Sequence, residues 1–221
     1  MIKNKDINGL KCSSMSVKDF CEPRVYEKAA MTPMPSARGG RVTKRLQLVH
    51  SDLGGPMSEP SRGGALYFGT FTDDFSRWTD VVFLQKKSDL LSEYKKWVTQ
   101  AQLHTGTKNK IMRSDNGGEY VSNAFKALHD ENGTMHQTTV PDTPQQNGVS
   151  ERLNRALVLM APTMMRHKDV DQDLWADAIK TAVYIKNRVT SRALLDGKTP
   201  FELWTRNKPN VSHMLVFGLT C

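Results

Sequence analysis

The spacing of apolar residues changes once along this chain, and that change constrains the fold more than any other feature. Residues 46–53, 65–73 and 78–85 are short runs rich in β-branched and aromatic side chains, joined by short turn sequences. They predict three strands in an antiparallel meander. From residue 88 onward, segments with helical spacing alternate with short apolar runs. The resulting order, βββ-α-β-α-β-α, predicts an α/β fold with a five-stranded mixed sheet and helices packed on it.

The later elements follow from the same spacing and from turn and cap residues. Helices are predicted over 88–104 and 122–133, strands over 109–114 and 134–140, a helix that begins close to Glu151, a helix of about 20 residues around 173–189, and a short segment at 199–204. Pro162 falls inside the helix that follows Glu151. We expect it to break or kink that helix, because proline lacks the backbone N–H and clashes with the preceding turn.

Positive charge is concentrated at the N-terminus. The net charge is +8, and residues 1–50 contain ten Lys and Arg against four acidic residues, which gives that segment +6. A basic segment of this kind suits a polyanionic partner such as nucleic acid, although a solvated, disordered tail is an equal alternative. We therefore divide the chain into a basic N-terminal arm (1–45), a core domain (46–190) and a C-terminal extension (191–221).

The composition excludes several classes of protein. No apolar run approaches the roughly 18 residues that suggest a membrane span, and the N-terminus has no signal-peptide core. The three cysteines, Cys12, Cys21 and Cys221, are too few and too scattered for a disulfide framework. These features predict an intracellular protein with reduced thiols and no membrane partner.

Three carboxylates lie at the ends of predicted elements. Asp52 ends the first strand, Asp115 ends the fourth, and Glu151 lies in the first turn of the helix after the fifth. If strands one and four are neighbours, both aspartates lie at one edge of the sheet. Carboxylates without nearby histidine suit hard divalent cations, Mg²⁺ above all. Each residue also has a plainer explanation. Asp52 could be an Asx-turn residue, Asp115 could simply belong to the turn "DNGG", and Glu151 could only complement the helix dipole. Asp73 and Asp74 we interpret as turn residues.

The helix that carries Glu151 is amphipathic. At 100° per residue, its predicted buried stripe falls within about 40° of one line. That stripe consists of Val149, Leu153, Leu157, Met160 and Met164. Glu151 points about 160° away from Leu153 and Arg155 projects from nearly the same side, so both are expected to face outward. We also expect Met165 to pack in the core.

The stretches "HSDLGGPM", "TFTDDFSRW", "MRSDNGGEYVSNAF", "TPQQNGVSERLNR" and "LWADAIKTAVYIKNRV" resemble the integrase core of copia-type LTR retrotransposons. That family belongs to the retroviral integrase superfamily, which has an RNase H-like fold. The resemblance runs from about Leu46 to Gly218. Its most specific feature is the interval of 35 residues between Asp115 and Glu151, which is the family's hallmark spacing.

The resemblance implies a role for each matching residue. Asp52, Asp115 and Glu151 would form the catalytic triad that binds Mg²⁺ or Mn²⁺, and residues 141–148 would form a flexible loop that positions DNA ends. The resemblance implies that the side-chain amides of Gln145, Gln146 and Asn147 contact the DNA. It also implies that Arg152 and Arg155 contact phosphate groups of the DNA. The two arginines could instead pair with acidic residues on neighbouring elements.

The chain departs from the family in its N-terminal arm. The family's zinc module uses two histidines followed by a Cys-x-x-Cys pair, whereas in "FCEPRVYEK" Arg24 stands where the last cysteine would be. No histidine precedes Cys21; the first is His50. Because tetrahedral zinc needs four ligands, we expect no zinc site and interpret residues 1–45 as the remnant of a zinc-binding module.

The resemblance implies a polynucleotidyl transferase that trims 3′ ends of element DNA and joins them to target DNA, working as a homo-multimer in the nucleus. The alternative is a catalytically idle, nucleic-acid-binding remnant of a truncated retrotransposon polyprotein. The missing cysteine and Pro162 favour that alternative, and the intact triad opposes it. An RNase H-like nuclease, which would cut without joining, fits the quoted stretches less well. The end of the sequence at "VFGLTC" is compatible with a truncated copy or with a segment of a polyprotein.

Overall fold

The computed structural model describes residues 42–138, 148–191, 193–194 and 197–218. Most of the predicted basic arm and all three cysteines lie outside these ranges. The expectation of no zinc site therefore stays a prediction, as do the domain boundaries.

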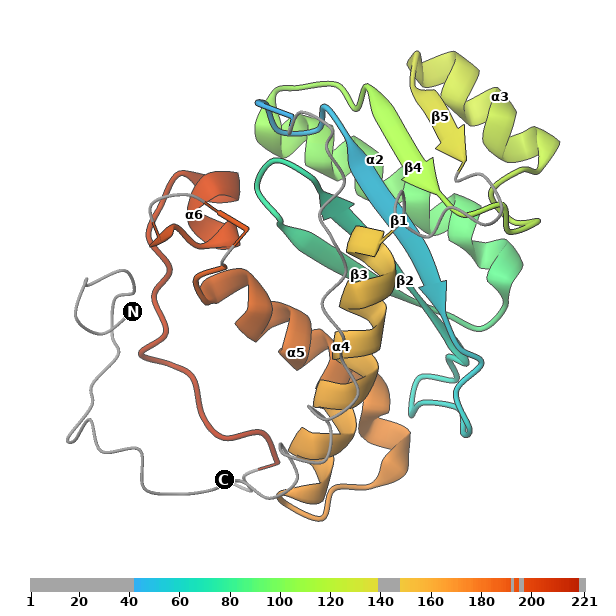
Figure 1. Ribbon diagram of the computed structural model, residues 1–221. Coiled ribbons are helices and arrows are strands. Elements are labelled where there is room, and N and C mark those ends of the chain that lie inside the picture. The colour runs from blue at the N-terminus through green and yellow to red at the C-terminus, as the bar shows by residue number, and fades with distance from the viewer. Residues whose placement is uncertain (1–41, 139–147, 192, 195–196, 219–221) are drawn as a thin grey trace.

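One five-stranded sheet forms the centre of the molecule, in the order β3-β2-β1-β4-β5 (Figure 1). The strands are β1 (Val49–Gly54), β2 (Tyr67–Asp73), β3 (Thr79–Leu84), β4 (Ile111–Ser114) and β5 (Met135–Thr138). β1 to β3 form an antiparallel meander, and β4 and β5 add in parallel beside β1. This arrangement confirms the predicted α/β fold and the five-stranded mixed sheet, and it meets the condition on which the placement of Asp52 and Asp115 at one edge depended, since the first strand pairs with the fourth.

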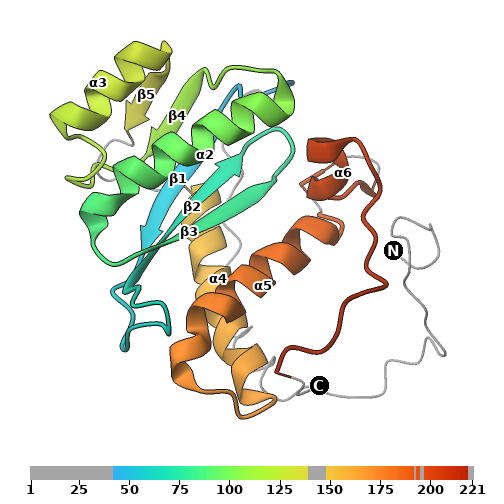
Figure 2. The ribbon, with the colours of Figure 1, turned by 180° about the vertical axis from the view of Figure 1, so that it is seen from behind.

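Helices cover both faces of the sheet. On one face lie α2 (Leu90–Thr105) and α3 (Asn123–Asn132), and on the other lie α4 (Gly148–Arg166) and α5 (Trp175–Arg188) (Figure 2). Each face has its own apolar core, the first around Phe71 and Tyr94 and the second around Phe68 and Ile179. The remaining elements are η1 (Lys87–Asp89), η2 (Gln172–Leu174) and α6 (Pro200–Thr205).

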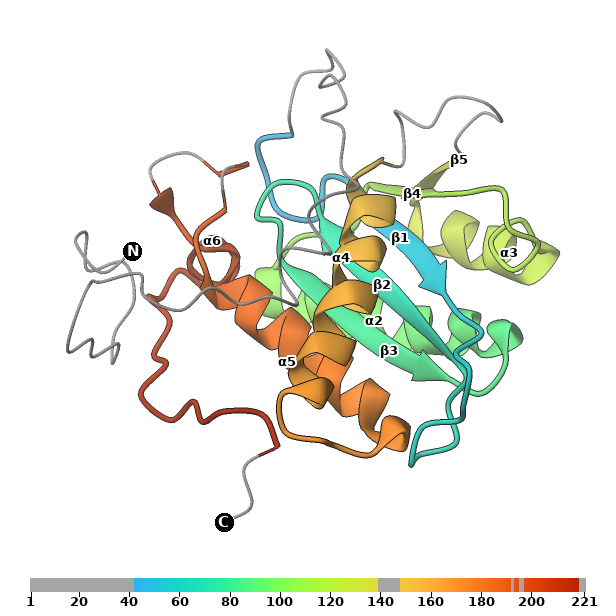
Figure 3. The same ribbon diagram turned by 60° about the horizontal axis from the view of Figure 1, so that its bottom comes forward.

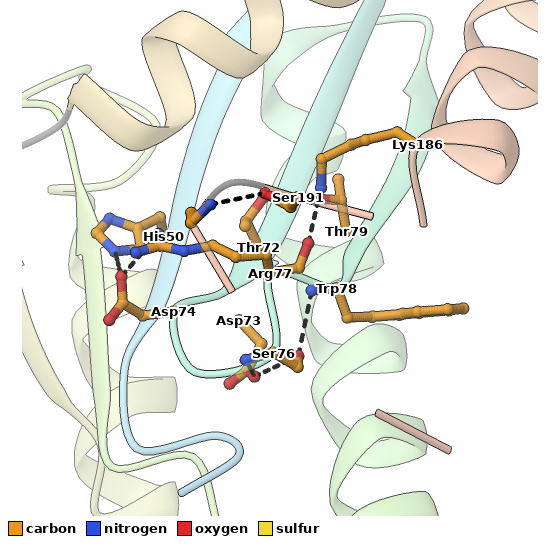
Figure 4. A network of polar contacts seen from close by, with 11 residues as sticks. His50, Thr72, Asp73, Asp74, Ser76, Arg77, Trp78, Thr79, Lys186 and Ser191 are labelled. Carbon is orange, nitrogen blue, oxygen red and sulfur yellow. Dashed lines mark hydrogen bonds and ion pairs between the residues drawn. The ribbon is translucent and has the colours of Figure 1, made fainter. Parts of the chain in front are cut away.

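The turn between β2 and β3 is held by buried carboxylates, as predicted for Asp73 and Asp74. Oδ2 of Asp73 accepts hydrogen bonds from the backbone N–H and the hydroxyl of Ser76 (Figure 4). Oδ1 of Asp73 accepts a hydrogen bond from the backbone N–H of Leu46. Leu46 has a φ of 57°, and the first strand begins at Val49 rather than at residue 46. Asp74 forms an ion pair with Arg77 and a hydrogen bond of 3.0 Å with Nε2 of His50.

The predicted break at Pro162 is wrong, because α4 runs unbroken from Gly148 to Arg166. Proline removes the hydrogen bond that would reach the carbonyl of Val158, a residue on the exposed side of the helix. In the next turn position, the hydroxyl of Thr163 donates to the carbonyl of Leu159 at 2.9 Å. These two features let the helix continue through the proline.

The buried stripe of α4 is rotated by about 60° from the predicted one. Met160 is 37% exposed, and Val149 and Met164 are only half-buried. The side chains that are buried are Ser150, Leu153, Asn154, Leu157, Ala161 and Met165. The predicted stripe consisted of apolar residues alone, whereas the polar residues Ser150 and Asn154 are also buried.

None of the described helices is long and apolar enough to cross a lipid bilayer.

Candidate active site

Asp52 lies in β1 and points toward α4. In the sheet it stands opposite Thr70 of β2. Its Oδ1 accepts a hydrogen bond from the backbone N–H of Leu53 at 2.9 Å, and its Oδ2 accepts one from Nδ2 of Asn154 at 3.0 Å. Two donors from different elements therefore fix the orientation of this half-buried carboxylate.

Asn154 is a residue of the site that the sequence did not reveal. Its side chain is 7% exposed and bridges two strands, because its Oδ1 accepts from the hydroxyl of the buried Thr70 at 2.9 Å. This pair of bonds offsets the cost of burying an amide on the sheet face of α4. The one available signal was an asparagine one helical turn after Glu151. Figure 3 shows α4 crossing β1 and β2, the position from which Asn154 reaches Asp52.

Asp115 follows Ser114, the last residue of β4. β1 and β4 pair in parallel, with His50 opposite Arg113. Oδ1 of Asp115 accepts a hydrogen bond from the backbone N–H of Gly117 at 3.1 Å. The negative charge of Asp115 acts on Asp52, two residues beyond His50 in β1. The membership of both aspartates in one site stays a prediction.

Gly117 leaves room for acidic side chains at this edge. A Cβ at that position would lie 2.8 Å from Oε1 of Glu119 and 3.0 Å from Oδ1 of Asp115. The two carboxylates therefore flank the same glycine. Glu119 is a further acidic group close to Asp115 that the sequence reading did not single out.

Glu151 lies in the first turn of α4 and is exposed, as predicted. The partial positive charge of a helix N-terminus stabilises an acidic group in that turn. The same turn carries Arg152, and Arg155 follows on the next; both are exposed. In the described part of the chain neither arginine forms an ion pair with an acidic residue. Gln145, Gln146 and Asn147 lie outside the described residues.

The three carboxylates act on one another. The pKa of Asp52 is raised to about 7, first because the group is buried, and next because of the negative charge of Asp115 and, more weakly, of Glu151. The hydrogen bonds from Leu53 and Asn154 oppose that rise. Burial and the two neighbouring negative charges disfavour the ionised form of Asp52. A cation bound beside Asp52 would be stabilised by the same negative charges.

The residues fit a divalent cation by the chemistry of their donors. All three are carboxylates, the hard oxygen ligands that Mg²⁺ and Mn²⁺ take in proteins. Across the described ranges, however, no three His, Cys, Asp or Glu side chains stand close enough together to hold an ion. In the structure the charges of Asp115 and Glu151 act on Asp52, and the role of the three carboxylates as metal ligands stays a prediction.

The backbone beneath the site is anchored on the opposite face of the sheet. The hydroxyl of Ser51, next to Asp52, lies 2.7 Å from the hydroxyl of the buried Tyr120. The hydroxyl of Ser114, next to Asp115, lies 2.9 Å from Nε2 of His136. These contacts fix the strand ends from which the two aspartates project.

The sequence matches the integrase core domain family over residues 42–144. A retrovirus-related Pol polyprotein from transposon TNT 1-94 of Nicotiana tabacum is 42% identical over 173 residues, which is 78% of this chain and 13% of that protein. The Pol polyprotein from transposon RE2 of Arabidopsis thaliana is 32% identical over 181 residues, 81% of this chain and 12% of that protein. The chain therefore spans 12–13% of the length of these two curated relatives.

Solved structures with the same fold include retroviral integrases. A chain of the simian T-cell lymphotropic virus intasome superposes with a TM-score of 0.61 at 18% identity and covers 79% of this chain and 60% of that one. The HTLV-2 integrase catalytic core domain, solved in complex with magnesium, gives a TM-score of 0.53 at 16% identity, covering 71% and 95%. At these identities the likeness establishes the RNase H-like fold and nothing finer.

Proposed function

The chain belongs to the integrase core domains of copia/Ty1-type retrotransposon Pol polyproteins, and from that premise we propose that it cuts and joins DNA strands with a divalent cation held by Asp52, Asp115 and Glu151. The observation that carries this proposal is the position of Asp52, a half-buried carboxylate held by Leu53 and Asn154, whose pKa is raised to about 7 by burial and then by the charges of Asp115 and Glu151. Both other carboxylates of the proposed site therefore act on Asp52.

A bound Mg²⁺ or Mn²⁺ would neutralise negative charge on the reacting phosphate and lower the pKa of a bound hydroxyl or water. The chain's own contribution is orientation. Leu53 and Asn154 hold the two oxygens of Asp52 in place, and Gly117 holds one oxygen of Asp115. Glu151, in the first turn of α4, is the proposed third ligand.

Two in-line displacements make up the proposed reaction. In 3′-end processing, water attacks a phosphorus atom of the element DNA, and the bond to the 3′ oxygen breaks to leave a free 3′-OH. In strand transfer, that 3′ oxygen attacks a phosphorus of the target DNA, the bond from this phosphorus to the target 3′ oxygen breaks, and the proton lost by the attacking hydroxyl is balanced, through water, by one gained by the leaving 3′ oxygen. No covalent bond to the protein forms in either step.

DNA is the proposed partner. Arg152 and Arg155, exposed beside Glu151 and without ion pairs in the described part of the chain, are suited to backbone phosphates. Gln145, Gln146 and Asn147 are proposed to offer amides to the DNA on the strength of the family resemblance alone. We further propose that the active form is a homo-multimer, because two DNA ends must be joined together, and that it acts in the nucleus.

A second candidate is a domain that binds nucleic acid without catalysis. One observation favours it: no ion-sized cluster of three ligands forms among the described side chains. Pro162 no longer supports it, because α4 is continuous.

Labelled duplex DNA, incubated with the chain and a circular target in Mn²⁺, in Ca²⁺ or in EDTA, separates these functions. We expect joined products in Mn²⁺ only. Cutting without joining would indicate a nuclease or a core that lacks its partners. Salt-sensitive DNA binding with no product in any condition would support the idle domain and overturn the proposed activity.

A further inference from the structure

A surface cavity of about 370 Å³ lies on the face of the sheet opposite Asp52. Three indole rings line it: Trp78 at the start of β3, Trp97 from α2 and Trp204 from α6. Asp52 faces α4, whereas this cavity adjoins α2, which covers the other face (Figure 2). The cavity is therefore separate from the candidate active site.

Two carboxylates line this aromatic cavity, Asp80 of β3 and Glu93 of α2, and Glu93 is already paired with Lys96. Oδ2 of Asp80 accepts two hydrogen bonds from indole N–H groups, from Trp78 at 2.9 Å and from Trp97 at 2.7 Å. Its Oδ1 accepts none from the residues that the structure describes. The two indoles thus fix the carboxylate and leave one oxygen available to a ligand with an N–H group.

Asp80 has no cationic partner among the described residues. His104 and Lys186 act on it only at longer range, and burial raises the pKa of its carboxyl group. At the rim, the ammonium of Lys96 is already paired with Glu93 at 2.7 Å. A desolvated carboxylate is costly unless a cation pairs with it, so this arrangement favours a positively charged ligand.

One wall of the cavity is also suited to a flat cation. The rings of Trp78 and Trp204 are nearly parallel, at 6°, with centroids 5.9 Å apart, and His104 stacks with Trp204 at 16° and 6.0 Å. Trp97 and Trp204 are buried, so the half-buried Trp78 is the indole that presents surface to a ligand. The position of Trp78 is fixed by a hydrogen bond from its backbone N–H to the hydroxyl of Ser76 (Figure 4). Indole faces attract cations, and guanidinium stacks on them better than ammonium because it is planar and weakly hydrated.

We propose that this cavity binds a guanidinium group, with the cation against the indole ring of Trp78 and an N–H donated to Oδ1 of Asp80. An arginine side chain of a partner protein is the source that fits, since the volume holds one such side chain and its charge would complete the ion pair that Asp80 lacks. The proposal is independent of the DNA chemistry at Asp52, because it depends only on β3, α2 and α6.

The full chain is titrated with acetyl-Gly-Arg-Gly-amide and with the matched lysine and glutamine peptides. Binding is followed by NMR of the indole N–H groups. Trp175 is the internal reference, because its Nε1 donates to the carbonyl of Glu59 on the other face of the sheet. The arginine peptide should shift the Trp78 and Trp97 signals and leave Trp175 unchanged. Equal binding of the glutamine or the lysine peptide would overturn the guanidinium assignment.

Asp80→Asn keeps the size of the side chain and an acceptor for the indoles but removes the charge. It should weaken the arginine peptide roughly tenfold or more, whereas Asp177→Asn, at an exposed position of α5, should not. Unchanged affinity in Asp80→Asn would refute the site. If that variant does not fold, Trp78→Leu, which removes one wall, should lose several-fold in affinity. Methylguanidinium is titrated alongside to identify the source of the guanidinium group. Tighter binding of the arginine peptide than of methylguanidinium indicates a protein partner, and equal affinity of the two indicates a small molecule.

Discussion

Asn154 of α4 donates a hydrogen bond of 3.0 Å to Oδ2 of Asp52 in β1, across 102 residues of sequence. The same amide accepts from Thr70 of β2 at 2.9 Å. One buried side chain therefore links the helix that carries Glu151 to the two strands at the centre of the sheet. The hydrogen bond between Asn154 and Asp52 therefore fixes the position of Asp52 relative to the helix that carries Glu151.

Replacing Asn154 by alanine should destabilise the protein and disturb Asp52 together. The buried hydroxyl of Thr70 loses its shorter hydrogen bond and keeps only the one of 3.4 Å to the carbonyl of Asp52, which should lower the free energy of unfolding by about 1–3 kcal/mol. Urea unfolding measures that loss. Asn123→Ala, at an exposed position of α3, is the control and should have an effect within about 0.5 kcal/mol. Equal losses in the two variants would show that the Asn154 contact has no special weight.

The stability of the metal-free protein should fall as pH rises. The pKa of Asp52 is about 7 in the folded protein and 3.8 as the ordinary value. The folded state therefore binds this proton more tightly than the unfolded state does. The resulting stabilisation is complete below pH 4 and is lost as pH rises toward 7.

Asp52→Asn should remove that pH dependence. At pH 8 the variant should exceed the wild type in free energy of unfolding by about 2–4 kcal/mol, because it replaces an unfavourable buried charge by a neutral amide. Unfolding measured from pH 4 to 8 in EDTA checks this. A wild-type profile that is flat over this range would contradict the raised pKa of Asp52.

Divalent cations should stabilise the protein in a pH-dependent way. At pH 8 Asp52 is ionised, and Mn²⁺ at about 100 times its dissociation constant should add about 2.7 kcal/mol. At pH 5.5 Asp52 holds its proton, and the gain should shrink. Thermal melts with and without Mn²⁺ at both pH values measure it. A gain that survives unchanged in Asp52→Asn would place the cation elsewhere.

Arg152 and Arg155 should contribute to DNA affinity without sequence preference. Log affinity falls linearly as log salt concentration rises, and each arginine that neutralises a phosphate makes this slope steeper by roughly 0.9. In the double variant, with glutamine at both positions, the slope should therefore be shallower by roughly 1.8. Fluorescence anisotropy at several salt concentrations provides the measurement, with Lys180→Gln on α5 as control. An unchanged slope in the double variant would remove both residues from the interface.

The fold class and the order of elements along the chain could be predicted from sequence because their signals are local. The β-branched runs before residue 85, the cap at Ser122 and the glycine at 133 each act within a few residues, and the structure shows the Ser122 cap and a left-handed Gly133. The order of strands in the sheet was not predicted, because the pairing of the first strand with the fourth is a contact between distant segments.

The parts that could not be predicted depend on contacts between distant elements. The buried face of α4 includes Asn154 only because Thr70 and Asp52 satisfy its amide, and a count of apolar residues cannot register that. The cavity around Asp80 gathers side chains from β3, α2 and α6, which are far apart in the sequence. Its three tryptophans are unremarkable until the fold brings them together.

The role of Glu151 in strand transfer provides the most direct test of the proposed function. Wild type, Glu151→Gln and Glu202→Gln are compared for joining of labelled duplex DNA to a target in Mn²⁺. Glu202 also lies in the first turn of a helix, α6, so its variant controls for the loss of a helix-dipole contact. We predict joined products from wild type and Glu202→Gln, and a loss of about 100-fold or more in Glu151→Gln. Equal joining by Glu151→Gln and wild type would contradict the assignment of Glu151 to the active site.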